Sequence, residues 1–167
     1  MSTLDKVALF HQAFKITTPQ ERAQKPGLPT LSVADRTELN ELAHELKKIA
    51  QRAFCTSAML RDDRDPAFSV FLRLQLMAEE LGEVAEAMAQ SDIAQTAHEL
   101  ADLDYVVSGT ILNMGLGILH NRVVDEIHRA NMSKLDRNGN PVLNEAGRVV
   151  KSEEFEPADV RPLLHDE

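Results

Sequence analysis

A long stretch of this chain carries many acids and no base. No lysine or arginine lies between Arg73 and Arg122. The same stretch contains the acids Glu79, Glu80, Glu83, Glu86, Asp92, Glu99, Asp102 and Asp104. These eight acids nearly account for the formal net charge of -9 of the whole 167-residue chain. Any fold of this stretch must therefore place its carboxylates where they tolerate one another, either in water or around cations.

The apolar residues around these acids recur at helical spacing and predict an all-α fold, an antiparallel bundle of helices. We expect helices over 7–15, 33–54, 67–90, 93–113 and 118–130. A proline-marked linker over 17–32 and a polar break over 61–67 interrupt them, with Pro66 near a helix start. Asp92 is suited to cap a helix and Gly115 to end one. After residue 135, "PVLNEAGRVV" has the composition of a small hairpin, followed by an extended tail.

The length is that of about one domain. We divide it into an N-terminal helix and linker (1–32), a helical core (33–135), and a C-terminal hairpin and tail (136–167). Cys55 is the only cysteine, and neither a signal peptide nor a membrane-spanning apolar run is evident. We expect a soluble cytoplasmic protein that binds no membrane. Because the chain is acidic and lacks a basic stripe, we also expect no nucleic-acid partner.

Two of the expected helices each carry a pair of acids three residues apart. Glu80 pairs with Glu83, and Glu99 pairs with Asp102. Residues at this spacing share one helix face, with Cβ atoms about 5–6 Å apart. The short turn over 90–92 makes the two helices antiparallel neighbours, and Glu83 and Glu99 flank that turn at similar distances. We therefore expect the two pairs to lie at similar depth.

The simplest explanation of these acids is a solvated helix face. Solvated faces usually interleave bases, however, and this stretch offers none. Apolar Leu76 and Val106 flank the acids and indicate partial burial, where unpaired carboxylates cost roughly several kcal/mol. Hard divalent cations with oxygen ligands would offset this cost, and a pair of such ions can activate a phosphoryl group and a water. Glu79, displaced around the helix, is placed to take the proton of that water.

Donor groups for a phosphate follow at the end of the last expected helix. "HRANMSK" places Arg129, Asn131 and Lys134 there, and phosphoryl transfer needs such groups. The alternative is that Arg129 and Lys134 only interact with the helix C-terminus. Near the N-terminus, His11 lies between Phe10 and Phe14. This group could stack on a base, although core packing is the better use for the two phenylalanines.

The sequences "EELGEVAEA" and "ELADLDYVVSGT" resemble the E-x-x-E and E-x-x-D signature of the all-α nucleoside triphosphate pyrophosphohydrolases. That group includes MazG-like enzymes, dimeric dUTPases and phosphoribosyl-ATP pyrophosphohydrolases. The segments "VALFHQAF" and "VDEIHRANMSKLDRNG" are similar to the MazG-like, phosphoribosyl-ATP-pyrophosphohydrolase-like branch. The resemblance covers about Leu4 to Phe14 and Phe71 to Leu164. Relative to short members, the helix over about 33–64 has the character of an insertion.

The resemblance implies a MazG-like bundle that hydrolyses a nucleoside triphosphate to the monophosphate and pyrophosphate. It implies Mg²⁺ as the cofactor, with Mn²⁺ as a substitute, and a homodimer or homotetramer as the assembly. It also implies roles for individual residues. Glu80, Glu83, Glu99 and Asp102 would bind the metal, and Glu79 would act as the general base or as an additional ligand. Asn131 and Lys134 would contact the substrate. Glu86 and Asp104 receive no role as ligands.

Two alternatives stay open. The first is hydrolysis of phosphoribosyl-ATP, which the chain length and the extra helix disfavour mildly. The second is a non-catalytic helical interaction module whose acids bind a basic partner. The base and sugar of the substrate are not determined by these residues.

Overall fold

The computed structural model describes residues 1–16, 26–60 and 65–164. Its helices are α1 (Thr3–Ala13), α2 (Val33–Leu60), α3 (Pro66–Gln90), α4 (Ile93–Asn113), α5 (His120–Met132) and a short 3-10 helix η1 (Pro162–Leu164). In these ranges the extended pairings are isolated antiparallel bridges, Leu135 with Pro141 and Leu143 with Val149. The predicted all-α class is confirmed. The expected linker and polar break lie partly outside the described residues, at 17–25 and 61–64.

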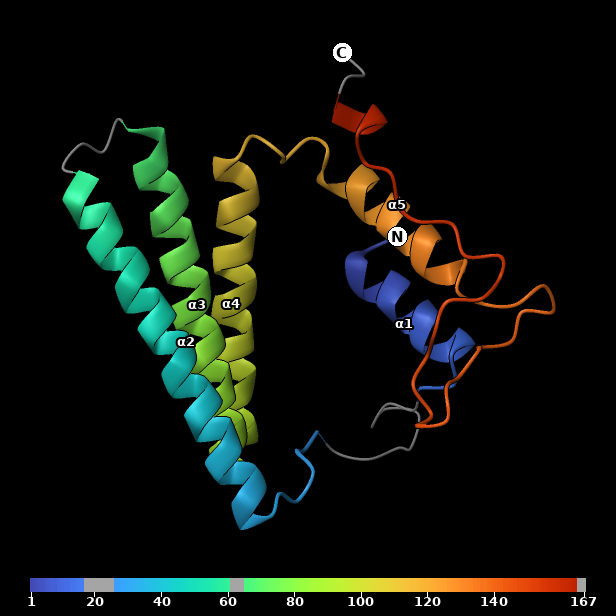
Figure 1. Cartoon of the computed structure of the whole chain (residues 1–167), viewed down its shortest axis with the longest axis horizontal. Helices are drawn as coiled ribbons and strands as arrows, with labels where there is room; N and C mark the ends of the chain where they lie inside the picture. The colour runs from blue at the N-terminus through green and yellow to red at the C-terminus, as the bar shows by residue number, and fades with distance from the viewer. Residues whose placement is uncertain (17–25, 61–64, 165–167) are drawn as a thin grey trace. The chain divides into compact units, whose positions relative to one another are not determined.

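The chain divides into two compact units. The helical unit comprises Pro26–Gly115, and the terminal unit comprises Met1–Lys25 with Leu116–Glu167. In the helical unit α3 packs against both α2 and α4, and the three helices alternate in direction (Figure 1). In the terminal unit α1 packs on α5. None of the helices among the described residues is both long and apolar enough to cross a membrane.

Local capping sets the ends of the two helices that carry the acid pairs. The Asp65 carboxylate accepts a hydrogen bond from the Ala67 backbone N–H at 2.8 Å, and Pro66 follows in the first turn of α3. The Asp92 carboxylate accepts hydrogen bonds from the N–H groups of Ala94 and Gln95, each at 3.0 Å. These caps satisfy backbone donors that a helix start leaves free. The predicted starts of both helices are thereby confirmed to within one residue.

Three other helices differ from the prediction at one end or both. α1 begins at Thr3 and not at Val7, because Ser2 and Asp5 form a reciprocal capping box that the apolar periodicity does not reveal. α2 continues to Leu60, six residues beyond Phe54, since no glycine or proline interrupts the chain before Pro66. α5 spans His120–Met132 and is shifted by two residues from the expected 118–130.

The contact between α2 and α3 is made by small residues. Ala43, Ala50 and Ala53 of α2 are buried. A Cβ atom added to Gly82 of α3 would lie 3.4 Å from the Ala43 carbonyl oxygen, so the two backbones approach closely here. Larger apolar residues of α2 behave differently, because Leu42 is 49% exposed and Ile49 is 45% exposed. The apolar side of α2 is therefore divided between a core contact and an open surface.

In the terminal unit, aromatic stacking and ion pairs join the segments. Phe14 is buried and its ring stacks on the half-buried Phe10 with centroids 4.2 Å apart, so the expected core use is confirmed for Phe14. The Lys6 Nζ atom lies 2.6 Å from Asp125 Oδ1, which ties α1 to α5. After α5 the predicted hairpin is limited to the isolated bridges. The three-segment domain division stays a prediction.

Candidate metal centre

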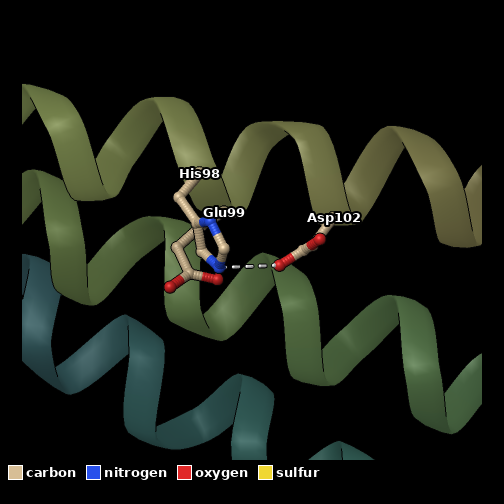
Figure 2. A group of neighbouring side chains, drawn as sticks. All are labelled: His98, Glu99 and Asp102. Carbon is tan, nitrogen blue, oxygen red and sulfur yellow. Dashed lines mark ion pairs between the residues drawn. The ribbon is translucent and has the colours of Figure 1, made fainter.

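The two predicted acid pairs meet across the contact between α3 and α4. Carboxylate oxygens of Glu80, Glu83 and Glu99 all lie within 4.8 Å of one another. A second group of the same size consists of His98, Glu99 and Asp102 on α4 (Figure 2). Glu99 belongs to both groups. The i,i+3 spacing predicted that the acids of each pair share one helix face and that the two pairs lie at similar depth. The distances among Glu80, Glu83 and Glu99 agree with this arrangement.

Glu99 is the most enclosed of these acids. Glu99 is only 7% exposed, and its carboxylate accepts a hydrogen bond from the side-chain amide of Gln95, one turn earlier on α4. A single neutral donor does not compensate a buried carboxylate, which offers about four lone-pair sites. Glu99 thus retains capacity for further ligands within the described structure.

Burial and mutual repulsion act together on Glu80 and Glu83. Burial raises the pKa of Glu80, and the charges of Asp102 and Glu99 raise it further. Burial likewise raises the pKa of Glu83, with Glu99 and Glu80 adding to the effect. Each charged form is therefore disfavoured in the absence of a cation. Carboxylates held this close, partly desolvated, are the donor type that Mg²⁺ and Mn²⁺ take, so the residues fit a divalent metal.

A base from another helix does reach these acids, although the stretch itself contains none. Lys47 on α2 donates from Nζ to Glu86 Oε2 at 2.7 Å. This hydrogen bond raises the pKa of Lys47, and the nearby charges of Glu83 and Glu79 raise it further. Glu86 is thereby paired with a lysine, whose charge also acts on Glu83 and Glu79. The run of sequence without bases did not disclose this, because Lys47 comes from another helix.

A cavity of about 380 Å³ opens beside these acids, between α2 and α3. Its walls include Glu79 and Glu83, together with Lys47, Ala50, Gln51, Phe54 and Gln75. The Oε1 atom of Gln75 is buried and has no hydrogen-bond partner among the described residues. Gln51 and Gln75 are not among the predicted site residues, and nothing in their spacing marks them. His98 does carry a signal, since it precedes Glu99 and lies one helical turn from Asp102.

The other predicted site residues lie in the terminal unit. Lys134 Nζ donates to Asn131 Oδ1 at 2.8 Å, so these two predicted substrate contacts are neighbours. Arg129 binds two carboxylates, Glu126 and Glu156, each at 2.8 Å. Its guanidinium therefore fixes the C-terminal tail to α5. His11 contacts Phe10 with ring centroids 6.4 Å apart. The substrate roles of these residues stay predictions.

Comparison with known proteins gives one match. The family model described as phosphoribosyl-ATP pyrophosphohydrolase matches residues 36–131, more than half of the chain. The match begins inside α2, so most of the segment over 33–64 that we expected to be an insertion falls within the matched span. Searches of curated proteins and of solved structures give no match. The span includes all four acids of the two pairs, and the chain belongs to the phosphoribosyl-ATP pyrophosphohydrolase family of all-α pyrophosphohydrolases.

Proposed function

We propose that this protein is a Mg²⁺-dependent nucleoside triphosphate pyrophosphohydrolase that converts a ribo- or deoxyribonucleoside triphosphate to its monophosphate and pyrophosphate. The strongest support is that two groups of three metal-ligating side chains share Glu99. We call them metal-sized groups, and they occur in a chain that belongs to a pyrophosphohydrolase family. We propose control of nucleotide pools as the cellular role.

In this proposal Glu80, Glu83, Glu99 and Asp102 hold the metal. When bound, divalent ions neutralise phosphate oxygens and lower the pKa of a coordinated water. Glu79 is exposed and borders the same cavity as Glu83, so its carboxylate is available to accept the proton of the attacking water. The water oxygen bonds to the α-phosphorus. The bond from the α-phosphorus to the oxygen that bridges it to the β-phosphorus breaks, and pyrophosphate leaves with the electron pair.

The cavity between α2 and α3 is a suitable place for the nucleoside. The amides of Gln51 and Gln75 offer donors and acceptors, and the half-exposed ring of Phe54 offers a stacking surface. The unpartnered Gln75 Oε1 atom supports this assignment, because a buried acceptor without a donor is costly and a ligand amino group would satisfy it. We retain Asn131 and Lys134 as further contacts with the substrate.

Phosphoribosyl-ATP is the second candidate substrate, and the description of the matched family favours it. It contains the same α–β bridge, so the same residues would act on it.

Pyrophosphate release from a panel of substrates tests the proposal. The panel contains the common ribo- and deoxyribonucleoside triphosphates and phosphoribosyl-ATP, each with Mg²⁺, with Mn²⁺ and with EDTA. We expect release from at least one substrate only when metal is present. No release from any of them, in a protein that is folded by circular dichroism, would favour the non-catalytic module.

We also propose that the protein is a homodimer or homotetramer assembled through the helical unit. A groove of about 550 Å³ runs over α2, α3 and α4, and its lining is almost entirely aliphatic. It includes Leu42, Leu81 and Leu100, which are each nearly half exposed. An apolar surface of this kind is costly in a monomer and is typical of a protein contact.

Substitution in this groove is expected to change the assembly. Leu42→Glu should shift the mass measured by size exclusion with light scattering to that of a monomer, because it would bury a charge at the contact. Met59→Glu is the matched control, since Met59 is exposed on the same helix outside the groove. A wild-type monomer, or a Leu42→Glu oligomer of unchanged mass, would contradict the assignment.

A further inference from the structure

We infer that His98 is a direct metal ligand, so that one of the two metal positions is built from nitrogen as well as oxygen donors and prefers a transition ion such as Mn²⁺ over Mg²⁺. This inference rests on the proposed metal site and adds a residue that the E-x-x-E and E-x-x-D signature does not contain.

The geometry places the imidazole among the carboxylates. His98 Nε2 lies 3.2 Å from Asp102 Oδ2, one turn further along α4 (Figure 2). Ligand atoms of His98, Glu99 and Asp102 all fall within 4.8 Å of one another. These three side chains therefore reach a common point without any change in the helix, which is the arrangement that a metal with several protein ligands requires.

A surface ion pair explains this geometry less well. The His98 and Asp102 side chains are 67% and 49% exposed, and an exposed i,i+4 pair contributes little to stability. Such a pair does not compensate the enclosed carboxylate of Glu99. A cation between the three side chains satisfies Glu99 and Asp102 together, and a neutral imidazole nitrogen is a common metal ligand.

The two groups sharing Glu99 then differ in chemistry. Glu80, Glu83 and Glu99 offer oxygen only, which suits Mg²⁺ and Mn²⁺ alike. The group with His98 adds an imidazole, which transition ions bind better than Mg²⁺ does. The structure thus indicates one unselective position and one selective position, joined by a shared carboxylate.

The test is the nitrogen coupling of bound Mn²⁺, measured by pulsed electron paramagnetic resonance on the full chain, together with calorimetric titration by Mn²⁺ and Mg²⁺. Three variants are compared with the wild type. His98→Gln removes the ring nitrogen and keeps a polar side chain, and His98→Asp replaces the nitrogen with oxygen. His44→Gln is the matched control, because His44 is exposed on α2 and belongs to neither group.

We expect imidazole coupling in the wild type and in His44→Gln and none in either His98 variant. The Mn²⁺ affinity of one position should fall about tenfold or more in His98→Gln, while the Mg²⁺ affinity is unchanged. His98→Asp should bind Mn²⁺ without preferring it to Mg²⁺. Binding without imidazole coupling in the wild type, or coupling that persists in His98→Gln, overturns the inference and leaves the proposed function standing. A wild type that binds neither ion overturns both.

Discussion

Glu83→Gln is expected to lower metal-dependent pyrophosphate release by at least about 100-fold, because it removes a charged oxygen from the group through which the metal is held. Ligand oxygens of Glu83, Glu80 and Glu99 lie within 4.8 Å of one another, and Glu83 also borders the cavity, so its loss affects both the metal group and the side open to substrate. Initial rates at saturating metal and substrate measure the effect.

The same substitution should not unfold the protein. In the metal-free state the pKa of Glu83 is raised by burial, so replacing the carboxylate by a neutral amide removes an unfavourable charge. We therefore expect a metal-free melting temperature at neutral pH equal to or above that of the wild type. Lost activity together with retained stability distinguishes a functional role from a structural one.

Glu41→Gln is the control for this experiment. Glu41 is an exposed acid on α2 that lies outside both groups of metal-ligating side chains and outside the apolar groove. Its conversion to an amide should leave turnover unchanged. If turnover by the Glu83→Gln variant stays within about tenfold of the wild type, the loss is too small for a direct metal ligand. Glu83 would then not belong to the metal site.

The second large effect is stabilisation by divalent metal. At a free concentration of about 100 times the dissociation constant, a ligand that binds only the folded state contributes about 2.7 kcal/mol. For a chain of this size that corresponds to a rise in melting temperature of roughly 5–10 °C. Calorimetric scans with Mg²⁺, with Mn²⁺, and with sodium chloride of equal ionic strength separate specific binding from screening.

This stabilisation should depend on pH in a defined direction. The pKa values of Glu80 and Glu83 are raised above their ordinary 4.5, so in metal-free solution the folded state binds more protons than the unfolded state above pH 4.5. Unfolding free energy therefore falls as pH rises through the raised pKa values. The pKa of Glu126 is lowered to about 2, chiefly by its hydrogen bond with Arg129. This shift makes the unfolding free energy rise with pH, but only below pH 4.5.

We accordingly expect the metal-free melting temperature to fall as the pH rises above 4.5 through the raised pKa values, and this fall to shrink when Mg²⁺ is saturating. In the Glu83→Gln variant, the fall of the melting temperature with pH and its rise on addition of metal should both be smaller. A wild-type melting temperature that is indifferent to Mg²⁺ and Mn²⁺ at neutral pH would mean that the acids do not hold a metal.

Local interactions explain which structural features the sequence predicts well. The starts of α3 and α4 depend on Asp65, Pro66 and Asp92, which act within a few residues of themselves. The i,i+3 pairs follow from helix geometry alone. The start of α1 was misplaced although its cause is also local, because the capping box of Ser2 and Asp5 precedes the first apolar residue of the periodic pattern.

Interactions between helices explain what the sequence did not predict. The pairing of Lys47 with Glu86 joins residues on α2 and α3 that lie far apart in the chain. The cavity with Gln51 and Gln75 exists only where those two helices pack. Leu42 belongs to the apolar side of α2 by periodicity, but periodicity does not tell whether α3 covers a residue or leaves it open.

By itself, the sequence determined that this chain forms helices and that two of them carry matched acid pairs, because capping and the helical repeat act over a few residues. The tertiary structure alone decided that Glu99 is enclosed and that its carboxylate lies within 4.8 Å of those of Glu80 and Glu83 on α3. Those properties depend on distances between side chains of packed helices. Such distances are set by the packing of α3 on α4 and not by spacing along the chain.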